Sequence, residues 1–165
     1  QPAPDAMVLD CGCGGGANIK TLLKLCPNGK VQGIDYSAVS VEKARKVNAR
    51  AIAAGRCTVQ QASVAELPFE AEQFDVVTAF ETVYFWPELA QNFREVYRVL
   101  KPGGTFFICN EANGETTKDD KWTKIIDGMT IYTDIALKAY LEQAGFCQIQ
   151  SHKNKKGWLC ITAQK

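Results

Sequence analysis

A carboxylate followed by closely spaced glycines is the feature of this sequence best suited to ligand chemistry. The apolar residues Val8 and Leu9 precede Asp10, and four glycines then fall within positions 12–16. Glycine has no Cβ, so the backbone can turn sharply there and approach a ligand closely. This order predicts a strand, a glycine-rich turn and the start of a helix, which together form the nucleotide-binding corner of a doubly wound α/β sheet.

Asp10 bears on which nucleotide this corner would bind. The pattern Gly12-x-Gly14-x-x-Ala17 also suits a dinucleotide, whose pyrophosphate lies against backbone N–H groups at the start of the helix. A carboxylate at the end of the strand would repel that pyrophosphate and attract a cationic ammonium group. S-adenosylmethionine carries an ammonium group and a sulfonium, so Asp10 favours it over a dinucleotide.

A second acidic residue lies where a ribose is expected. Residues 31–35 read as the second strand, and Asp35 at its end comes nineteen positions after Gly16. This is close to the spacing of roughly 20 residues at which an acid binds ribose hydroxyls. Asp35 could instead cap the helix that follows, but Ser37 can provide that cap by itself. We therefore expect Asp35 to bind the ribose.

The rest of the chain alternates short apolar runs with segments of helical periodicity. This alternation predicts an α/β fold with a doubly wound, mostly parallel seven-stranded sheet that ends in an antiparallel hairpin. The helices are expected at 19–26, 41–54, 89–100, 122–129 and 133–144. After the first two strands, the others are expected at 57–61, 74–80, 105–110, 146–152 and 158–162. Residues 101–104, Lys-Pro-Gly-Gly, are expected to end a helix and to have no chemical role.

Five motifs occur in order at compatible spacings: Asp10-x-Gly12-x-Gly14-Gly15-Gly16, Gly33-Ile34-Asp35-Tyr36-Ser37, Leu67-Pro68-Phe69, Phe74-Asp75-Val76-Val77 and Leu100-Lys101-Pro102-Gly103-Gly104. Together they resemble the class I S-adenosylmethionine-dependent methyltransferases of the branch that acts on small molecules. The resemblance runs from Met7 to about Asn110, some two-thirds of the chain. It implies a Rossmann-like fold, S-adenosyl-L-methionine as the cofactor and a small-molecule methyl acceptor. It does not identify that acceptor or its receiving atom.

The resemblance also implies which residues bind the methionine and ribose parts of the cofactor. Ligands of such folds lie beyond the carboxyl ends of the strands. The first of these ends carries Asp10 and the turn that contains Gly12, Cys13 and Gly14, which would face the methionine part. Asp35, at the second, would bind the ribose.

Four further residues are expected to border the cofactor. Tyr36 would pack on the adenine face. Ser63 stands where many relatives have an Asp that accepts a hydrogen bond from the adenine amino group, and it could still form one hydrogen bond. The backbone N–H of Val64 could serve a ring nitrogen. Phe80, at the end of the fourth strand, completes the expected set.

The segment after the fourth strand is expected to face the methyl acceptor. Glu81 and Tyr84 are the expected catalytic residues, with Glu111 and His152 as other candidates for a general base. The aromatic residues 84–86 could wall this site or could simply pack in the core. The segment has neither the Asn- or Asp-Pro-Pro-aromatic sequence of DNA-adenine and protein-glutamine methyltransferases nor the Pro-Cys of C5-cytosine enzymes.

Composition excludes several kinds of partner. Nineteen basic and eighteen acidic residues leave a net charge of +1, which gives no electrostatic reason to bind nucleic acid. The longest apolar stretches fall short of a membrane span of about 18 residues, and no secretory leader is visible. An odd count of seven cysteines favours reduced thiols and a cytoplasmic location. Cys11-x-Cys13 has no second ligand pair, so no metal site is expected.

The 165 residues are expected to form one methyltransferase domain, residues 1–165. The sequence enters its first strand by about Met7, whereas related methyltransferases usually carry one or two helices before it that cover the substrate. We expect those lid helices to be absent here. Two alternatives stay open: a nicotinamide-dependent reductase, which Asp10 disfavours, and a cofactor-binding protein without turnover. The sequence leaves the oligomeric state open.

Overall fold

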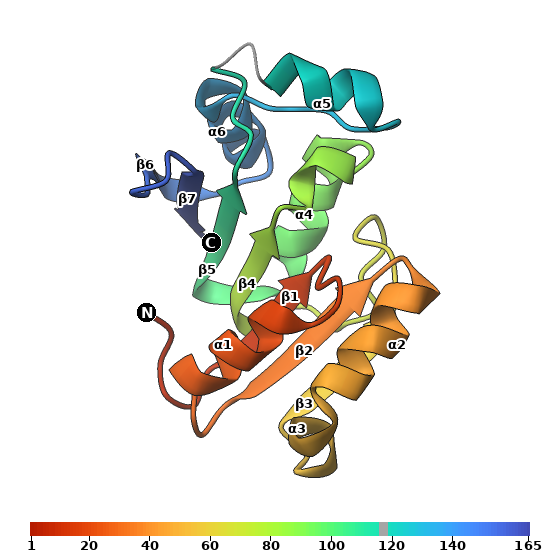
Figure 1. Cartoon of the computed structure of the whole chain (residues 1–165). Coiled ribbons are helices and arrows are strands. Elements are labelled where there is room, and N and C mark those ends of the chain that lie inside the picture. Colours follow the sequence, from red (N-terminus) through yellow and green to blue (C-terminus); the bar gives the residue numbers. More distant parts are fainter. Residues whose placement is uncertain (116–118) are drawn as a thin grey trace.

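The computed structural model describes residues 1–115 and 119–165 and is shown in Figure 1. The strands are β1 (Met7–Cys11), β2 (Lys30–Asp35), β3 (Cys57–Gln61), β4 (Phe74–Phe80), β5 (Leu100–Asn110), β6 (Cys147–Lys153) and β7 (Leu159–Gln164). The helices are α1 (Ala17–Leu25), α2 (Ala38–Val47), α3 (Ala49–Ala53), the 3₁₀ turn η1 (Val83–Phe85), α4 (Leu89–Val99), α5 (Asp119–Ile125) and α6 (Asp134–Gln143).

The strands form one seven-stranded sheet in the order β3-β2-β1-β4-β5-β7-β6. Strands β1 to β5 pair in parallel, while β7 is antiparallel to both β5 and β6. The doubly wound, mostly parallel sheet with a C-terminal antiparallel hairpin is therefore confirmed. The chain leaves β1 for β2 on one side and later returns to β4 on the other. Ligands of such sheets bind at this change of direction, outside the carboxyl ends of the strands.

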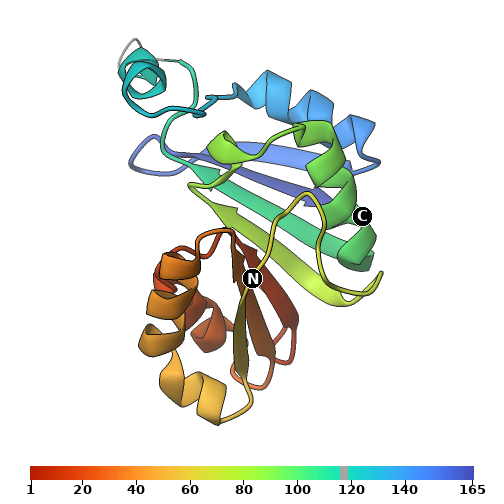
Figure 2. The ribbon, with the colours of Figure 1, turned by 90° about the vertical axis from the view of Figure 1, so that its right-hand side faces the viewer.

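Both faces of the sheet are covered, and β1 shows how one strand serves both. Val8 belongs to a buried cluster with side chains of α1 and α2, whereas Leu9 belongs to another with side chains of α4 and α6. Successive side chains of a strand point to opposite faces, so both residues are fully buried. Figure 2 shows α1 and α2 on one side of the sheet and α4 on the other.

Two helix starts follow from capping residues in the sequence. Ser37 Oγ accepts a hydrogen bond from Ser40 N–H at 3.3 Å at the start of α2. Thr133 Oγ1 accepts from Ala136 N–H at 3.3 Å at the start of α6. Each cap satisfies an N–H group that has no partner within its own helix.

Three boundaries differ from the sequence-based expectation. The helix expected over 41–54 is divided at Asn48, whose buried amide donates to the carbonyls of Gly16 and Ala44 at 3.0 and 2.9 Å. Strand β5 begins at Leu100, directly after α4, and its pairing with β4 shifts between Phe74 and Val76. Helix α5 ends at Ile125, before residues 126–129, which form a loop.

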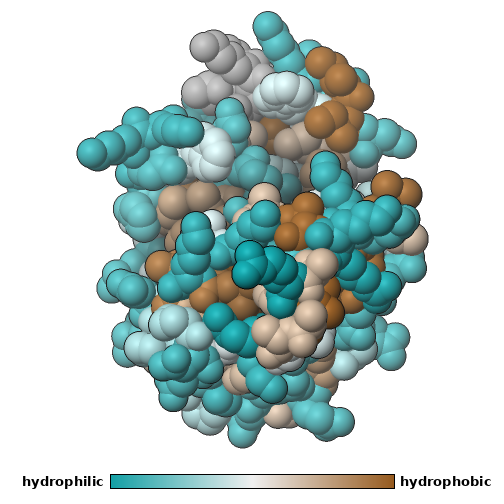
Figure 3. All heavy atoms as spheres, turned by 60° about the horizontal axis from the view of Figure 1, so that its bottom comes forward, coloured by the Kyte–Doolittle hydropathy of each residue, from teal (hydrophilic) through white to brown (hydrophobic). Residues whose placement is uncertain are grey.

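The surface mixes hydrophilic and hydrophobic side chains. Figure 3, in which the bottom of Figure 1 comes forward, shows mainly hydrophilic side chains with hydrophobic ones between them. Within residues 1–115 and 119–165, no helix has the length and apolar character that a membrane crossing needs. The large hydrophobic residues that are exposed include Tyr36, Phe85 and Trp122, which all lie at the site described next.

Candidate active site

The glycine turn after β1 is fastened to β2 and touches the loop after β4. The backbone N–H groups of Gly12 and Cys13 both donate to the Ile34 carbonyl, at 2.8 and 2.9 Å. Gly12 has φ 72°, and a Cβ added there would lie 2.0 Å from Thr82 Oγ1. Glycine is therefore required at this position, because a side chain would be strained and would push the two loops apart.

Asp10 is almost completely buried beneath this turn, with 1% of its surface exposed. Its Oδ1 accepts a hydrogen bond from Thr78 Oγ1 at 2.8 Å, and its Oδ2 has no partner among the residues that the structure describes. Burial, with a smaller contribution from the charge of Asp35, raises the pKa of Asp10 from 3.8 to about 7. A cationic hydrogen-bond donor beside Oδ2 would offset the cost of burying this charge.

Asp35 orders the site from the end of β2. Its Oδ2 accepts from Gly14 N–H and its Oδ1 accepts from Ser37 N–H, both at 2.9 Å. The N-terminal cap of α2 is the Ser37 side chain, so that role does not fall to Asp35. Each carboxylate oxygen can accept more than one hydrogen bond, so Asp35 keeps capacity for ligand hydroxyls.

A cavity of about 410 Å³, here called the nucleotide cavity, opens beside these residues. Five of the residues predicted to bind the cofactor line it: Gly12, Asp35, Tyr36, Ser63 and Val64. Its remaining wall comes from the end of β2, the loop after β3, the loop after β4 and the loop after α5, through Ile34, Ala62, Thr82, Phe85, Trp86, Pro87, Asp127 and Gly128.

A second cavity of about 270 Å³, here called the aromatic cavity, lies between the loops after β4 and β5 and the segment around α5. Its lining is Glu81, Tyr84, Phe85, Glu111, Ala112, Trp122, Ile126 and Met129. Phe85 also lines the nucleotide cavity, so the two cavities are neighbours. The loop after α5 borders both, and its Thr130 N–H donates to the Tyr84 carbonyl at 2.8 Å.

The predicted catalytic residues Glu81 and Tyr84 are in contact in the aromatic cavity. Glu81 has φ 57°, and its Oε1 accepts from the Glu111 backbone N–H. The Tyr84 hydroxyl accepts from Ala112 N–H at 2.9 Å and lies 3.4 Å from Glu81 Oε2. Partial burial of the carboxyl group raises the pKa of Glu81 above its usual value, and the charge of Glu111 acts in the same direction. Glu81 is thus held in place and is easier to protonate than an ordinary carboxylate.

Five predicted residues line neither of these two cavities: Asp10, which is buried beneath the glycine turn, Gly14, whose N–H donates to Asp35, and Cys13, Phe80 and His152. The Cys13 side chain is buried with α1 and α2, and its N–H is bonded to Ile34. The Phe80 ring packs on Phe107 and lines a separate cavity beside α1. His152 is exposed on β6 and lines neither of the two cavities.

The remaining predictions concern metals and the chain segment around α5. Cys11 and Cys13 belong to buried clusters on opposite faces of the sheet, so their thiols do not converge. The sequence reasoning missed Trp122, Ile126, Asp127 and Met129, which come from beyond the recognisable motifs. Their only signal in the sequence is an apolar helical pattern over 122–129, which does not show which cavity it would cover.

The sequence matches a known protein family over the residues that form this site. A family model described as "Methyltransferase domain" fits residues 9–108, which is more than half of the chain. The chain belongs to the class I S-adenosylmethionine-dependent methyltransferases. The matched residues contain the glycine turn, Asp35, the loop after β3 and the loop that carries Glu81 and Tyr84. The family is one of methyltransferases rather than nicotinamide-dependent reductases.

Individual relatives of this methyltransferase are named for a methylenesterol and a demethylmenaquinone. The chain is 29% identical over 147 residues to the 24-methylenesterol C-methyltransferase 2 of Arabidopsis thaliana, covering 87% of this chain and 40% of that protein. It is 35% identical over 111 residues to the demethylmenaquinone methyltransferase of Symbiobacterium thermophilum, covering 67% of this chain and 44% of that protein. The chain thus spans less than half the length of these curated relatives.

Solved structures share the fold at low identity. One such structure is described as a complex between the Haloferax volcanii Trm112 methyltransferase activator and the putative methyltransferase. It superimposes on this chain with a TM-score of 0.86 at 21% identity, covering 96% of this chain and 82% of the matched chain. The geranyl diphosphate C-methyltransferase of Streptomyces coelicolor gives a TM-score of 0.85 at 14% identity, covering 99% and 71%. These likenesses confirm the Rossmann-like methyltransferase fold.

S-adenosylmethionine is the cofactor of this family, and the described residues fit it. The orphaned Oδ2 of buried Asp10 suits the ammonium of the methionine part. A Cβ added at Gly14, with φ 51°, would meet no described heavy atom within 4 Å, so the turn is open to a ligand at that point. Asp35, Tyr36, Ser63 and Val64 line one cavity, as an adenosine would require.

Proposed function

We propose that this methyltransferase moves a methyl group from S-adenosylmethionine to a small apolar acceptor bound in the aromatic cavity. The observation that carries this proposal is the shared wall of the two cavities at Phe85. A cofactor in one cavity and an acceptor in the other would lie next to each other beside Phe85. Methyl transfer is an in-line displacement, so its main structural requirement is that the receiving atom of the acceptor lies close to the methyl group of the cofactor.

The cofactor is proposed to be held by side chains at the carboxyl ends of the strands. Asp10 would accept from the ammonium group, Asp35 would accept from the ribose hydroxyls, and Tyr36 would cover the adenine. When bound, S-adenosylmethionine supplies an activated methyl group on a sulfonium, which is a good leaving group. The protein then contributes mainly positioning, an effect that reaches roughly 7–11 kcal/mol in well-oriented reactions.

Glu81 and Tyr84 are proposed to act on the acceptor. An acceptor that carries a proton on its receiving atom needs a base, and the Glu81 carboxylate lines the cavity where that atom would lie. The Tyr84 hydroxyl lies 3.4 Å from Glu81 Oε2, and the Glu111 N–H holds Oε1. These contacts would fix the direction of the carboxylate while Glu81 takes up the proton.

The apolar character of the proposed acceptor is supported by the cavity and by the relatives. Five of the cavity's eight lining residues are apolar: Phe85, Ala112, Trp122, Ile126 and Met129. Two of the named relatives methylate a methylenesterol and a demethylmenaquinone. We also propose that the chain works in the cytosol, because its seven cysteines are all free thiols and six of them are buried.

Calorimetric titration with S-adenosylhomocysteine and with NADH tests the cofactor part of the proposal. We expect micromolar binding of S-adenosylhomocysteine and no measurable binding of NADH, because Asp10 would repel the pyrophosphate. Tight binding of NADH alone would contradict the proposal. Turnover is tested with apolar acceptors and S-adenosylmethionine by measuring S-adenosylhomocysteine formation; binding of the cofactor without turnover on any of them would favour a binding protein.

A further inference from the structure

The charges in the aromatic cavity bear on the kind of acceptor that it takes. Two carboxylates, Glu81 and Glu111, line a cavity whose other side chains are aromatic or apolar. No Lys, Arg or His is among its described lining residues. Both residues are exposed at the cavity, and two neighbouring carboxylates without a basic residue in the lining repel an anionic ligand.

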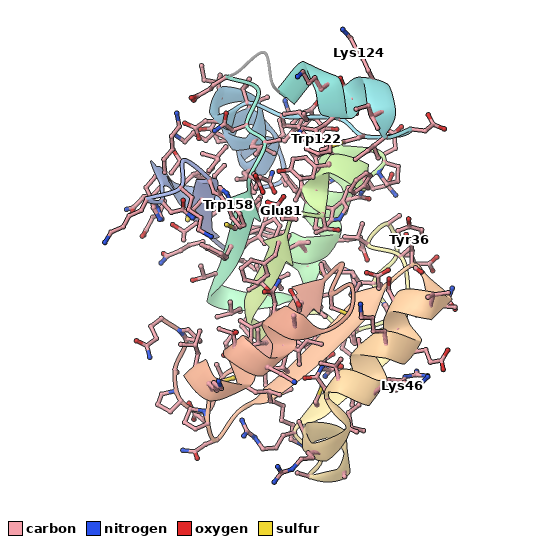
Figure 4. The ribbon with its side chains drawn as sticks, viewed as in Figure 1. Tyr36, Lys46, Glu81, Trp122, Lys124 and Trp158 are labelled. Carbon is pink, nitrogen blue, oxygen red and sulfur yellow. The ribbon has the colours of Figure 1, made fainter. Side chains whose placement is uncertain are left out.

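The aromatic side chains strengthen this electrostatic preference. Tyr84, Phe85 and Trp122 come from two segments that face each other across the cavity, η1 and α5. Figure 4 shows Trp122 on the side of α5 that faces Glu81, whereas Lys124 of the same helix points away from the body of the molecule. Aromatic faces attract cations, and aromatic rings combined with carboxylates are the usual surroundings of bound ammonium groups.

The way in which Glu81 is held suits it to act as a base toward a bound ammonium group. Its left-handed backbone conformation, φ 57°, is uncommon for a residue with a side chain and persists where several contacts enforce it. Here the contacts are the Glu111 N–H and the Tyr84 hydroxyl. Burial of the carboxyl group, with Glu111 nearby, raises the pKa of Glu81, which favours its holding a proton.

We propose that the acceptor is an apolar amine, whose nitrogen is bound as an ammonium between Glu81, Glu111 and the aromatic side chains. This inference rests on the proposed function, since it concerns the acceptor of the same site. An ammonium nitrogen has no free electron pair, so it must lose a proton before it can be methylated. Glu81 takes that proton: the N–H bond breaks, an O–H bond forms on the carboxylate, and the electron pair stays on nitrogen.

Three ligands with the same apolar body test this charge preference: benzylamine, benzyl alcohol and benzoate. Each is titrated calorimetrically into the chain saturated with S-adenosylhomocysteine at pH 7.5. We expect benzylammonium to bind about tenfold more tightly than benzyl alcohol, and benzoate not to bind. Equal binding of the cation and the alcohol, or no binding of the cation, would overturn the inference.

Two variants locate the preference in the cavity. Glu111→Gln should reduce the advantage of benzylammonium over benzyl alcohol to about twofold to threefold, because it removes one of the two charges. Glu81→Gln should do the same, and its thermal unfolding checks that the loop still folds. The control is Glu115→Gln, which changes the net charge equally at a nearby residue that pairs with Lys153 and does not line the cavity. An unchanged preference in both cavity variants, or an equal loss in the control, would also overturn the inference.

Failure of this inference is distinguishable from failure of the proposed function. Binding of S-adenosylhomocysteine is measured first, without any acceptor. If the unmodified chain does not bind S-adenosylhomocysteine, the proposed function is contradicted. Binding of S-adenosylhomocysteine with no preference for the ammonium would overturn the amine acceptor alone and would favour a neutral one.

Discussion

Asp10 gives the sharpest test of how the site is built, because its burial makes a prediction that needs no ligand. The pKa of Asp10 is raised from 3.8 to about 7 in the folded chain. A folded-state pKa above the unfolded one means that stability is full below about pH 4 and is lost as pH rises through about 7. At 1.36 kcal/mol for each unit, ionising Asp10 costs the ligand-free fold about 4 kcal/mol.

The variant Asp10→Asn keeps the shape of the side chain and removes its titration. Between pH 5 and pH 8 the unmodified chain should lose about 3 kcal/mol more unfolding free energy than the variant does. Urea denaturation of both proteins at the two pH values measures this double difference, in which the other titrating groups cancel. Parallel pH dependence of the two proteins would refute the argument that Asp10 is buried without a compensating partner.

The same variant tests the proposed role of Asp10 toward the cofactor. Asp10→Asn should weaken binding of S-adenosylhomocysteine, which carries an ammonium group, more than it weakens binding of adenosine, which does not. Both affinities are measured by calorimetry at pH 8, where the carboxylate of the unmodified chain is ionised. Equal losses for the two ligands would mean that Asp10 only orders the glycine turn.

Two further substitutions separate binding from catalysis. Asp35→Ala should weaken S-adenosylhomocysteine binding by about 1.5–3 kcal/mol. The control is Ser37→Ala, which removes the α2 cap. It should lower the free energy of unfolding by about 1 kcal/mol and leave the affinity for S-adenosylhomocysteine unchanged. Tyr84→Phe should lower the rate of methyl transfer and leave cofactor affinity unchanged, because the hydroxyl contacts Glu81 and Ala112 and does not line the nucleotide cavity. A Tyr84→Phe variant with reduced S-adenosylhomocysteine affinity would contradict that separation.

Local patterns in the sequence were sufficient to predict much of the sheet and several residues that line the nucleotide cavity. Strands β3 and β4 have the predicted bounds. In β4 an apolar run between turn residues has few other ways to be buried, and in β3 the buried Cys57 and Val59 alternate with polar residues. The grouping of Gly12 and Asp35 in one cavity also follows, since both lie at carboxyl ends of adjacent parallel strands.

Features that depend on packing between distant segments could not be predicted from such local patterns. Phe80 and Ala79 are neighbours in β4, and the pleat sends them to opposite faces; only the assembled sheet shows that Phe80 turns toward α1. The helix break at Asn48 depends on its bond to the Gly16 carbonyl, more than thirty residues earlier in the chain. Trp122 and Met129 reach the aromatic cavity for a similar reason, because the fold brings their segment over the loop after β4.

The position of β7 between β5 and β6 has a bearing on how the chain folds during synthesis. Strand β5 pairs with β4 on one side, and its other edge stays unpaired until residues 159–164 have left the ribosome. A nascent chain would therefore expose a long strand edge beside the segment that supplies Glu111, and such edges invite association with other chains. Chaperone capture or rapid translation of residues 126–165 would limit that exposure, so the yield of folded protein should depend on elongation speed in this region more than elsewhere.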